Sequence, residues 1–405
     1  MRVMKDSGVE WLGQVPEGWK IGRAKDAVVL HHGSDPQKEG DTPVYGSGET
    51  SFKTCGESKQ GPTVLLGRKG TIGVPQYIEG SYWNVDTAFD AKPRSENYNL
   101  KFFYYYSSCV DCGSYQTQAA VPSMNQSAYY SIPMPLPPLE EQRRIADYLD
   151  ERCASIDAAI NAAKASIEDC KAYRASLIDC SISGAIFPEP SKREGRLPNL
   201  EAIPEQWECP HLNQICKHIT DGSHNSPQIV EEGYPYVTAT DVYGWKIDFA
   251  KTKKISGKDY EALVAQGCKP QKDDVLLVKD GATTGRTGYV SDDTDCVLLS
   301  SVAMLRAKDF VNPRYLRYML DSSYLQNQIL AAMAGSALPR ITLNKLSHFR
   351  AILPPLADQC AIVSYLDERC AAIDAVIEKN QAIIDELAAY RKSLIYEVVT
   401  GKREV

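Results

Sequence analysis

Two glycine-rich segments with cationic and hydroxyl side chains are the first places to look for chemistry in this chain. They read Gly67-Arg-Lys-Gly-Thr-Ile-Gly and Gly281-Ala-Thr-Thr-Gly-Arg-Thr-Gly. Neither has the spacing of a dinucleotide site or the Gly-Lys-Ser/Thr ending of a P-loop. Glu57-Ser-Lys59 is a Glu-x-Lys triplet such as nucleases use, but no acidic residue on an apolar strand precedes it, so we interpret it as a solvated turn. The chain also lacks the Asn-Pro-Pro-aromatic signature of amino-methyltransferases, and we expect it to have no active site.

Metal binding is also not expected. The twelve cysteines are scattered, and the one close pair, Cys109-Val-Asp-Cys112, has no second pair at zinc-ligand spacing. The six histidines show no metal-ligand spacing either. In a reducing compartment such cysteines are best interpreted as small buried apolar residues.

Composition is that of an ordinary globular protein, with 405 residues, enough for two or three domains, and 43% hydrophobic residues. No apolar run approaches the roughly 18 residues of a membrane span, and the polar N-terminus has no secretory segment, so we expect a cytoplasmic protein without membrane association. The net charge of −7 is concentrated in residues 140–183 (9 acidic, 6 basic) and 357–399 (8 acidic, 4 basic). The rest of the chain is therefore neutral and can present a local basic face.

An internal duplication organises the chain. Residues 136–155 (LPPLEEQRRIADYLDERCAS) and 353–372 (LPPLADQCAIVSYLDERCAA) share 13 of 20 positions at an offset of 217. The match continues to Gly184 and Gly401. A helical period alone would not repeat polar identities such as Asp-Glu-Arg-Cys, so the repeat reflects duplication of a whole unit.

The repeated segments predict two long helices. Apolar residues recur every three or four positions, as in a coiled-coil seam with one stutter. The first stripe is Ile145, Leu149, Ile156, Ile160, Ala163, Ile167, Cys170 and Leu177, and the second is Ile362, Leu366, Ile373, Ile377, Ile384, Leu387, Leu394 and Val398. Pro-Pro pairs precede both helices, and Gly184 and Gly401 are expected to end them. Helices about 60 Å long need a partner, and each is the obvious partner of the other.

The remaining sequence predicts two similar globular domains. Short Val/Ile/Tyr runs such as Thr63–Gly67 and Val275–Val278 alternate with glycine turns and short helices, which is typical of a mixed α/β domain with a strongly bent sheet. The expected boundaries are a first domain at 1–138, a first spacer helix at 139–185, a linker at 186–200, a second domain at 201–354 and a second spacer helix at 355–405. The predicted fold is α/β (mixed), with two long helices in an antiparallel coiled coil and pseudo-two-fold symmetry.

With these features the chain resembles the specificity subunit of a type I restriction–modification system. The resemblance lies in Pro137–Gln142 with Ile145 and in Pro354–Gln359 with Ile362, which match that family's helix entrances. Further motifs of its target-recognition domains are matched by Pro43-Val-Tyr-Gly-Ser-Gly48, by Thr220-Asp-Gly-Ser-His224 followed by Gly233-Tyr-Pro-Tyr-Val, and by Asp274-Val-Leu-Leu-Val-Lys-Asp-Gly281 with Gly285-Arg286. Each motif is weak alone, but two copies in one order are specific.

The resemblance implies a non-catalytic subunit that reads double-stranded DNA for a defence system. Two methylation subunits, which carry S-adenosylmethionine, would dock on it and methylate an adenine amino group after flipping the base. Two motor–nuclease subunits, which use ATP and Mg, would complete the restriction complex. No cofactor is expected in this chain itself.

The duplication fits this role physically. Two similar domains related by a pseudo-two-fold axis can sit on duplex DNA, which has local two-fold axes of its own. Paired helices would then hold the domains about 35–70 Å apart, one to two helical turns. The expected target is bipartite, with an unread gap and two different half-sites.

The candidate DNA-binding residues are polar or cationic side chains near glycine turns. Arg and Lys suit guanine, and Asn and Gln suit adenine. In the first domain they are Ser47, Arg68, Lys69, Thr71 and Asn125, and in the second they are His224, Lys279, Asp280, Arg286 and Arg340. For each, a surface turn or a phosphate contact is the alternative interpretation.

The candidate partner-docking residues are polar identities that the seam does not explain. They are Asp150, Glu151, Arg152, Asp367, Glu368 and Arg369. The alternative is solvated charge and internal ion pairs.

The same sequence features leave three other functions open. A bivalent transcription regulator would work without methylation subunits, and a self-sufficient nuclease or methyltransferase would act on DNA alone. An orphan specificity subunit would support methylation only.

Overall fold

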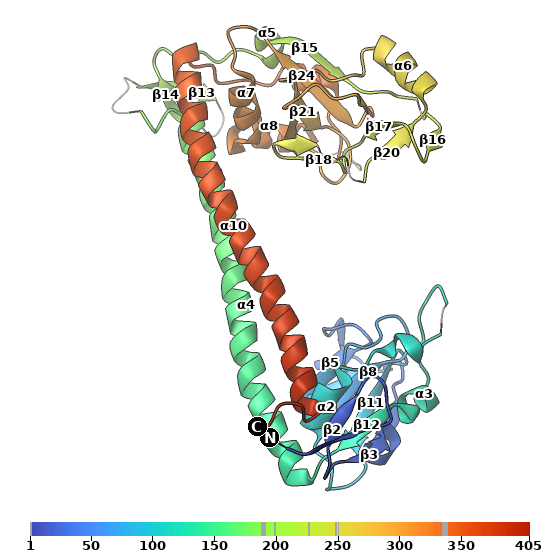
Figure 1. Cartoon of the computed structure of the whole chain (residues 1–405). Helices are drawn as coiled ribbons and strands as arrows, with labels where there is room; N and C mark the ends of the chain where they lie inside the picture. The colour runs from blue at the N-terminus through green and yellow to red at the C-terminus, as the bar shows by residue number, and fades with distance from the viewer. Residues whose placement is uncertain are drawn as a thin grey trace. The chain divides into compact units, whose positions relative to one another are not determined.

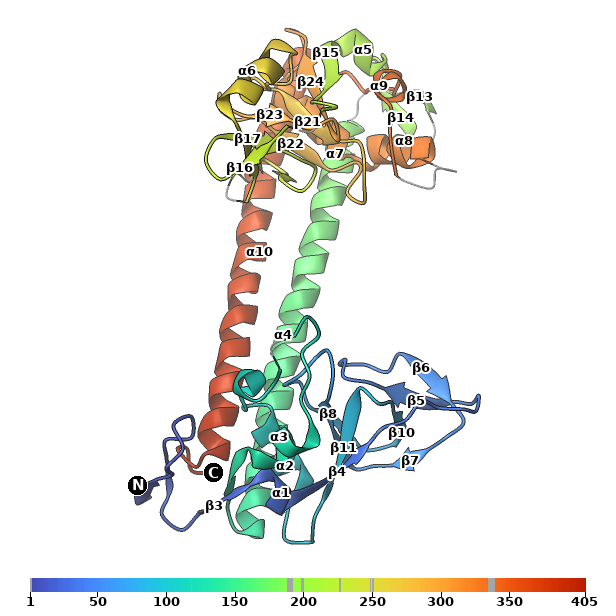
Figure 2. The same ribbon diagram turned by 90° about the vertical axis from the view of Figure 1, so that its right-hand side faces the viewer.

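We describe a computed structural model of the chain, covering residues 2–117, 119–187, 192–197, 200–225, 227–247, 249, 251–333 and 339–405. The chain divides into two compact units (Figures 1 and 2). Unit 1 comprises Met1–Ala165 with Asn380–Val405, and unit 2 comprises Ser166–Lys379. Each unit therefore contains one globular domain together with part of each long helix.

In its described residues the first domain is built from short strands, three short α-helices and a 3-10 helix at Cys112–Ser114. Its strands are β1 (Met4–Asp6), β2 (Gln14–Pro16), β3 (Lys20–Arg23), β4 (Val28–His32), β5 (Thr42–Tyr45), β6 (Lys53–Cys55), β7 (Lys59–Gln60), β8 (Thr63–Gly67), β9 (Gln76–Ile78), β10 (Ser81–Asn84), β11 (Ala88–Pro93) and β12 (Pro133–Leu136). Its α-helices are α1 (Ala24–Ala27), α2 (Leu100–Ser107) and α3 (Gln126–Ser131).

The second domain repeats this plan with additional helices. Its strands are β13 (Lys192–Leu197), β14 (Leu200–Pro204), β15 (Cys216–Asp221), β16 (Ile229–Val230), β17 (Tyr234–Val237), β18 (Val242–Tyr243), β19 (Lys246–Ile247), β20 (Lys253–Ile255), β21 (Val275–Val278), β22 (Thr287–Tyr289), β23 (Val297–Leu298) and β24 (Val302–Ala307). Its helices are α5 (Leu212–Ile215), α6 (Gly257–Ala265), α7 (Pro313–Asp321), α8 (Ser323–Met333) and α9 (Leu343–Ser347).

The sheets of the two domains have corresponding strand orders. The four-stranded sheet β4-β11-β8-β9 of the first domain corresponds to β15-β24-β21-β22 of the second, and both are antiparallel throughout. Each domain has a further four-stranded sheet with one parallel pair, β5 with β10 and β17 with β23. The predicted class, mixed α/β with two similar domains, is confirmed, and the runs at Thr63–Gly67 and Val275–Val278 are the buried strands β8 and β21.

The two long helices are α4 (Leu139–Ile182) and α10 (Leu356–Val399), each of 44 residues. Both begin beside a Pro-Pro pair, and both end two residues before a glycine with left-handed backbone, with φ of +79° at Gly184 and +71° at Gly401. A Cβ atom on Gly401 would lie 2.5 Å from the ring of Pro16, so this stop requires glycine for its space as well as its φ.

Antiparallel helix pairing is visible inside each unit separately. In unit 1, Ile145 and Leu149 near the start of α4 share a core with Val398 near the end of α10. In unit 2, Leu177 near the end of α4 shares a core with Leu366 near the start of α10. Start packs against end in both units, as the sequence predicted. Every residue of the two predicted apolar stripes is buried or half-buried.

One short helix in each domain lies against the long helices. These are α2 in unit 1 and α7 in unit 2 (Figure 1), capped by the side chains of Asn99 and Asn312. Both belong to the same cores as the long-helix stripes. The predicted linker at 186–200 lies partly outside the described residues; within it, Lys192–Leu197 form β13, which pairs with β14.

Candidate nucleic-acid interface

The candidates of the first domain gather where β8 ends. Four of the five belong to this loop or contact it, namely Ser47, Arg68, Lys69 and Thr71. A Cβ atom on Gly67 would lie 1.9 Å from the carbonyl oxygen of Thr71 and 3.3 Å from Cβ of Ser47. The loop therefore folds tightly back on itself because position 67 has no side chain.

Both cations of this loop share one carboxylate. Arg68 Nη1 pairs with Asp86, and Lys69 Nζ lies 3.6 Å from Oδ2 of Asp86. The Lys69 side chain is 50% exposed, against 27% for Arg68. Lys69 is thus the more accessible of the two. Sequence reasoning missed Asp86 because it belongs to no motif and lies 17 residues from Lys69 along the chain.

A second segment crosses the same loop and contains Asn125. Gly70 donates its backbone N–H to the carbonyl of Pro122 at 3.0 Å, and Met124 donates to the carbonyl of Arg68 at 2.9 Å. The Asn125 side-chain oxygen accepts from the backbone N–H of Ala128, which caps α3. The structure therefore gives Asn125 a capping role, which occupies the acceptor half of its carboxamide.

Four candidates of the second domain form one charged cluster together with Asp221. They are His224, Lys279, Asp280 and Arg340. Lys279 Nζ lies 3.2 Å from Asp221 Oδ2 and 3.0 Å from Asp280 Oδ2. Arg340 Nε lies 3.2 Å from Asp280 Oδ1. Asp221 was not predicted as a site residue, although it stands in the motif Thr220-Asp-Gly-Ser-His224 that ends in a candidate.

Burial separates the roles within this cluster. Lys279 is only 2% exposed, and its ammonium group is held between two carboxylates. Such a group supports a loop and is not presented to a ligand. The Arg340 and His224 side chains are 61% and 65% exposed and are the accessible members of the cluster.

The two clusters share one backbone frame. In the second domain Gly281 donates to the carbonyl of Pro339 at 3.0 Å, and Ile341 donates to that of Lys279 at 2.8 Å. These bonds correspond to those of Gly70 with Pro122 and of Met124 with Arg68 in the first domain. Corresponding positions therefore hold Arg68 and Lys279, Lys69 and Asp280, and Ser123 and Arg340. The same frame carries different side chains in the two domains.

Arg286 lies outside this cluster. Its guanidinium stacks over Tyr243, with 4.4 Å from Cζ to the ring centroid. Both residues line a cleft of about 810 Å³ within unit 2, together with Arg174 of α4 and Arg317 of α7. Arg317 is buried, stacks on Trp245 and pairs with Asp321.

The repeated aspartates of the long helices contact their own domains. Tyr105 donates to Asp150 at 2.7 Å, and Tyr318 donates to Asp367 at 2.9 Å. Burial, followed by the hydrogen bond to Asp150, raises the pKa of Tyr105 above its ordinary value, and burial and Asp367 do the same for Tyr318. Lys101 and Arg314 add an ion pair to the respective aspartate. Holding the domain to the helix accounts for the repetition of Asp150 and Asp367.

The other four docking candidates face outward. Glu151 and Glu368 are exposed, as are Arg152 and Arg369. Each arginine stacks over a tyrosine one helical turn earlier, at 5.5 Å over Tyr148 and 5.7 Å over Tyr365. These side chains form the same exposed pattern on both helices, and their role in docking stays a prediction.

Two buried glutamines are the contacts that sequence reasoning missed most clearly. Gln142 accepts from the backbone N–H of Asn99 and donates to the carbonyl of Pro137, both at 2.8 Å. Gln359 makes the same two bonds, to Asn312 at 2.8 Å and to Pro354 at 2.9 Å. Each glutamine therefore joins the start of a long helix to the N-cap of α2 or α7. Their place in the repeated Pro-Pro-Leu-x-x-Gln motif was the available indication.

A tryptophan in each domain contacts both long helices. Trp19 donates to Glu141 at the start of α4, at 2.9 Å, and a Cβ atom on Gly401 beyond α10 would lie 3.0 Å from its ring. Trp207 donates to Asp358 at the start of α10, at 3.1 Å, and a Cβ atom on Gly184 would lie 3.0 Å from its ring. Each domain is thus pinned to the start of one helix and the end of the other.

Ion pairs between the helices follow the same repeat. Arg174 pairs with Asp374 at 2.7 Å in unit 2, and Arg391 pairs with Asp157 at 3.0 Å in unit 1. The arginines are 217 positions apart, as are the aspartates. Each pair links α4 to α10. The repeated polar residues therefore contact the other long helix as well as the globular domain.

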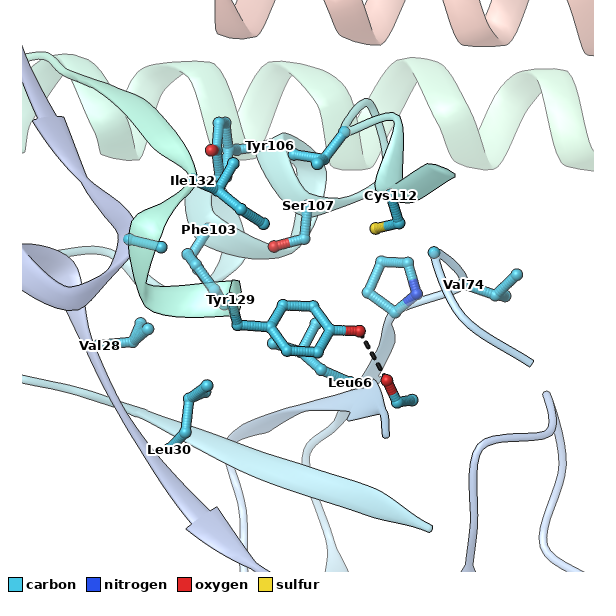
Figure 3. Close-up of a pocket in the computed structure, with 15 residues that line it drawn as sticks. Val28, Leu30, Leu66, Val74, Phe103, Tyr106, Ser107, Cys112, Tyr129 and Ile132 are labelled. Carbon is cyan, nitrogen blue, oxygen red and sulfur yellow. Dashed lines mark hydrogen bonds between the residues drawn. The ribbon is translucent and has the colours of Figure 1, made fainter. Parts of the chain in front are cut away.

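Metal-ligand clusters and enclosed cavities were the remaining candidates for a site in the described part of the chain. No group of three or more His, Cys, Asp or Glu residues there could hold a metal ion. An apolar cavity in unit 1, between Leu66, Phe103, Cys112 and Tyr129, has room for about one water molecule at 20 Å³ (Figure 3). Tyr129 in its wall donates to the carbonyl of Gly67 at 2.6 Å. This cavity is a packing gap in the domain core and is too small for a substrate.

Sequence comparison decides the family. The family described as "Type I restriction modification DNA specificity domain" matches residues 16–168 and 204–387, one match in each half of the repeat. The chain belongs to this family. The predicted resemblance to type I specificity subunits is thereby confirmed.

Members of the specificity-subunit family with curated descriptions align over most of the chain. The type I restriction enzyme EcoBI specificity subunit of Escherichia coli is 23% identical over 325 residues, which cover 76% of this chain and 67% of that protein. The putative type I restriction enzyme MjaX specificity subunit of Methanocaldococcus jannaschii is 23% identical and covers 97% of this chain and 96% of that protein.

A solved structure shares the fold. A chain from a study titled "Structural basis underlying complex assembly and conformational transition of the type I R-M system" superposes with a TM-score of 0.69 at 17% identity, and covers 96% of this chain and 99% of that chain. No helix among the described residues is both long and apolar enough to cross a membrane.

Proposed function

We propose that this chain reads a bipartite, asymmetric DNA site, one half with each globular domain. The observation that carries this proposal is the common loop frame with different side chains, Lys69 and Ser123 in one domain and Asp280 and Arg340 in the other. Loops on a fixed scaffold change their ligand by changing side chains, without changing the fold. Two such loops would recognise two different half-sites.

The long helices set the distance between the half-sites. Each is a continuous helix of 44 residues, and each domain is pinned to the start of one and the end of the other by Trp19 or Trp207. A fixed helix length then specifies a fixed number of unread base pairs. In this proposal the long helices set the length of the gap, and the globular domains read the bases.

The chemistry belongs to partner subunits. In this proposal the chain has no active site and binds no cofactor. Two methylation subunits carrying S-adenosylmethionine dock on the exposed helix faces at Glu151, Arg152, Glu368 and Arg369. They methylate N6 of adenine after base flipping. Two motor–nuclease subunits using ATP and Mg complete the restriction complex. The repeat of the docking residues at one offset supports two identical partners.

Adenine-methylation mapping tests this function. Methylated adenines are mapped genome-wide in cells with and without the gene for this chain. We expect one bipartite motif with two unlike halves, and its loss on deletion. A methylation pattern that is unchanged by the deletion would refute the proposal, and an unpartnered chain that regulates transcription would support the bivalent regulator instead.

A further inference from the structure

The exposed side chain of Arg340 is paired with a neighbouring carboxylate. Its guanidinium lies at the surface with 61% exposure, and its Nε atom lies 3.2 Å from Oδ1 of Asp280. Among the described residues, no other ion pair involves its two terminal nitrogens. The ion pair therefore involves Nε and leaves the two terminal nitrogens, which carry the donor fork, without an ion pair among these residues.

Asp280 is itself held by a buried cation. Lys279 Nζ lies 3.0 Å from Oδ2 of Asp280 and 3.2 Å from Oδ2 of Asp221. Two carboxylates thus face two cations, and the charges of these four groups balance. This balance matters at a DNA surface, because an uncompensated Asp280 would repel phosphates.

Backbone hydrogen bonds hold Asp280 and Arg340 next to each other. Asp280 and Arg340 form an antiparallel β-bridge, and the hydrogen bonds of Gly281 with Pro339 and of Ile341 with Lys279 flank it. Thr342, two residues beyond Arg340, accepts from Lys345 N–H and caps α9. Arg340 is therefore attached to a segment tied down on both sides.

We propose that Arg340 reads a guanine in the half-site of the second domain and that Asp280 positions it. A terminal guanidinium fork matches the O6 and N7 acceptors of guanine in the major groove, which is the commonest specific contact to that base. This inference rests on the proposed function, because it requires the second domain to face DNA. Beyond that function, it names one base of this half-site and the residue that reads it.

The first domain has no Asp–Arg pair at the corresponding positions. The positions of Arg340 and Asp280 are occupied there by Ser123 and Lys69, and Lys69 is paired with Asp86. A guanine contact made by an arginine at this position is therefore expected only in the second half-site. The asymmetry provides an internal control, since the first half-site should not respond to changes at Arg340.

The experiment uses the full chain assembled with its methylation subunits and a library of duplexes randomised in both half-sites. Three variants are compared with the natural chain, Arg340→Gln, Arg340→Lys and Asp280→Asn. Lys258→Gln, which removes an exposed cation on α6, is the matched charge control. The readouts are base preference at each position and the salt dependence of binding.

Arg340→Gln should lower the preference for guanine about five-fold to a hundred-fold at one position of the second half-site. Arg340→Lys keeps the charge without the planar fork and should lose part of this preference. Asp280→Asn should also lose part of it, with the contact residue intact. The first half-site and Lys258→Gln should keep natural preferences.

Two results overturn the inference. An even loss of binding at all sequences in Arg340→Gln, with a salt slope reduced by about one and full recovery in Arg340→Lys, identifies a phosphate contact. Unchanged preferences in both Arg340 variants show that the residue does not contact DNA. If instead the natural assembly shows no sequence preference, the proposed function fails, and this result is distinct from either of the others.

Discussion

One buried glutamine should stabilise the contact between the start of each long helix and its globular domain. Gln142 is 2% exposed and Gln359 is 1% exposed, and each bonds one backbone N–H and one Pro carbonyl that lie beside it. Methionine has a similar length and can bond neither group. Gln142→Met and Gln359→Met therefore remove the hydrogen bonds without opening a large cavity.

The expected cost follows from the groups left unpaired. Each variant leaves one half-buried donor and one buried acceptor without a partner, at about 1–2 kcal/mol apiece, so we expect a loss of about 2–4 kcal/mol in the free energy of unfolding. A third contact, to the carbonyl of Asn97 or Phe310, is longer in both cases at 3.2–3.3 Å and adds little. In a unit of this size the loss corresponds to a fall in Tm of about 5–15 °C.

Thermal and chemical denaturation of the two variants measure this cost, with Gln381→Met as the control. Gln381 is exposed on α10, where its one hydrogen bond is to Asp385 on the same helix at 3.0 Å, so its replacement should change stability by less than about 0.5 kcal/mol. Equal small effects in all three variants would refute the reasoning, because the buried bonds would then contribute nothing beyond those of a surface glutamine.

Two further predictions concern the helix end and the buried thiols. Gly401→Ala should destabilise more than Gly8→Ala, since both have left-handed φ but only Gly401 would place a Cβ atom against Pro16, at 2.5 Å; denaturation that ranks them equally would contradict the steric argument. Burial raises the pKa of the Cys216 thiol to about 12, so it should resist alkylation at pH 8 under native conditions while exposed Cys180 reacts. Because the folded pKa of Cys216 is raised, its contribution to stability is present below the unfolded thiol pKa and should decline as pH rises above about 9, which denaturation at several pH values would measure.

The long helices could be predicted in detail because their information is local. Apolar residues at three- and four-residue spacing fix the seam, a Pro-Pro pair fixes each start, and Gly184 and Gly401 fix the ends. The repeat also indicated that the polar residues shared by the two helices, such as Asp-Glu-Arg, have a role beyond the apolar seam. It did not show that Asp150 faces Tyr105, because that contact joins residues 45 positions apart across the fold.

The candidate site was predicted in its location and less well in the roles of its residues. Glycine turns pointed to the loops that follow β8 and β21, and the structure brings most candidates together there. The burial of Lys279 could not be seen, since it depends on Asp221 from a strand 58 residues earlier. Asn125 has the residue type of a base reader and of a helix cap, and only the position of α3 distinguishes them.

The central claim is that two readers are separated by helices of fixed length. The direct measurement inserts seven residues into both α4 and α10, near residues 165 and 379, which keeps the apolar seam and lengthens each helix by about 10 Å. Methylation mapping should then return the same two half-sites with a gap longer by about three base pairs, at about 3.4 Å each. Altered half-sites, or an unchanged gap in an active assembly, would contradict the claim.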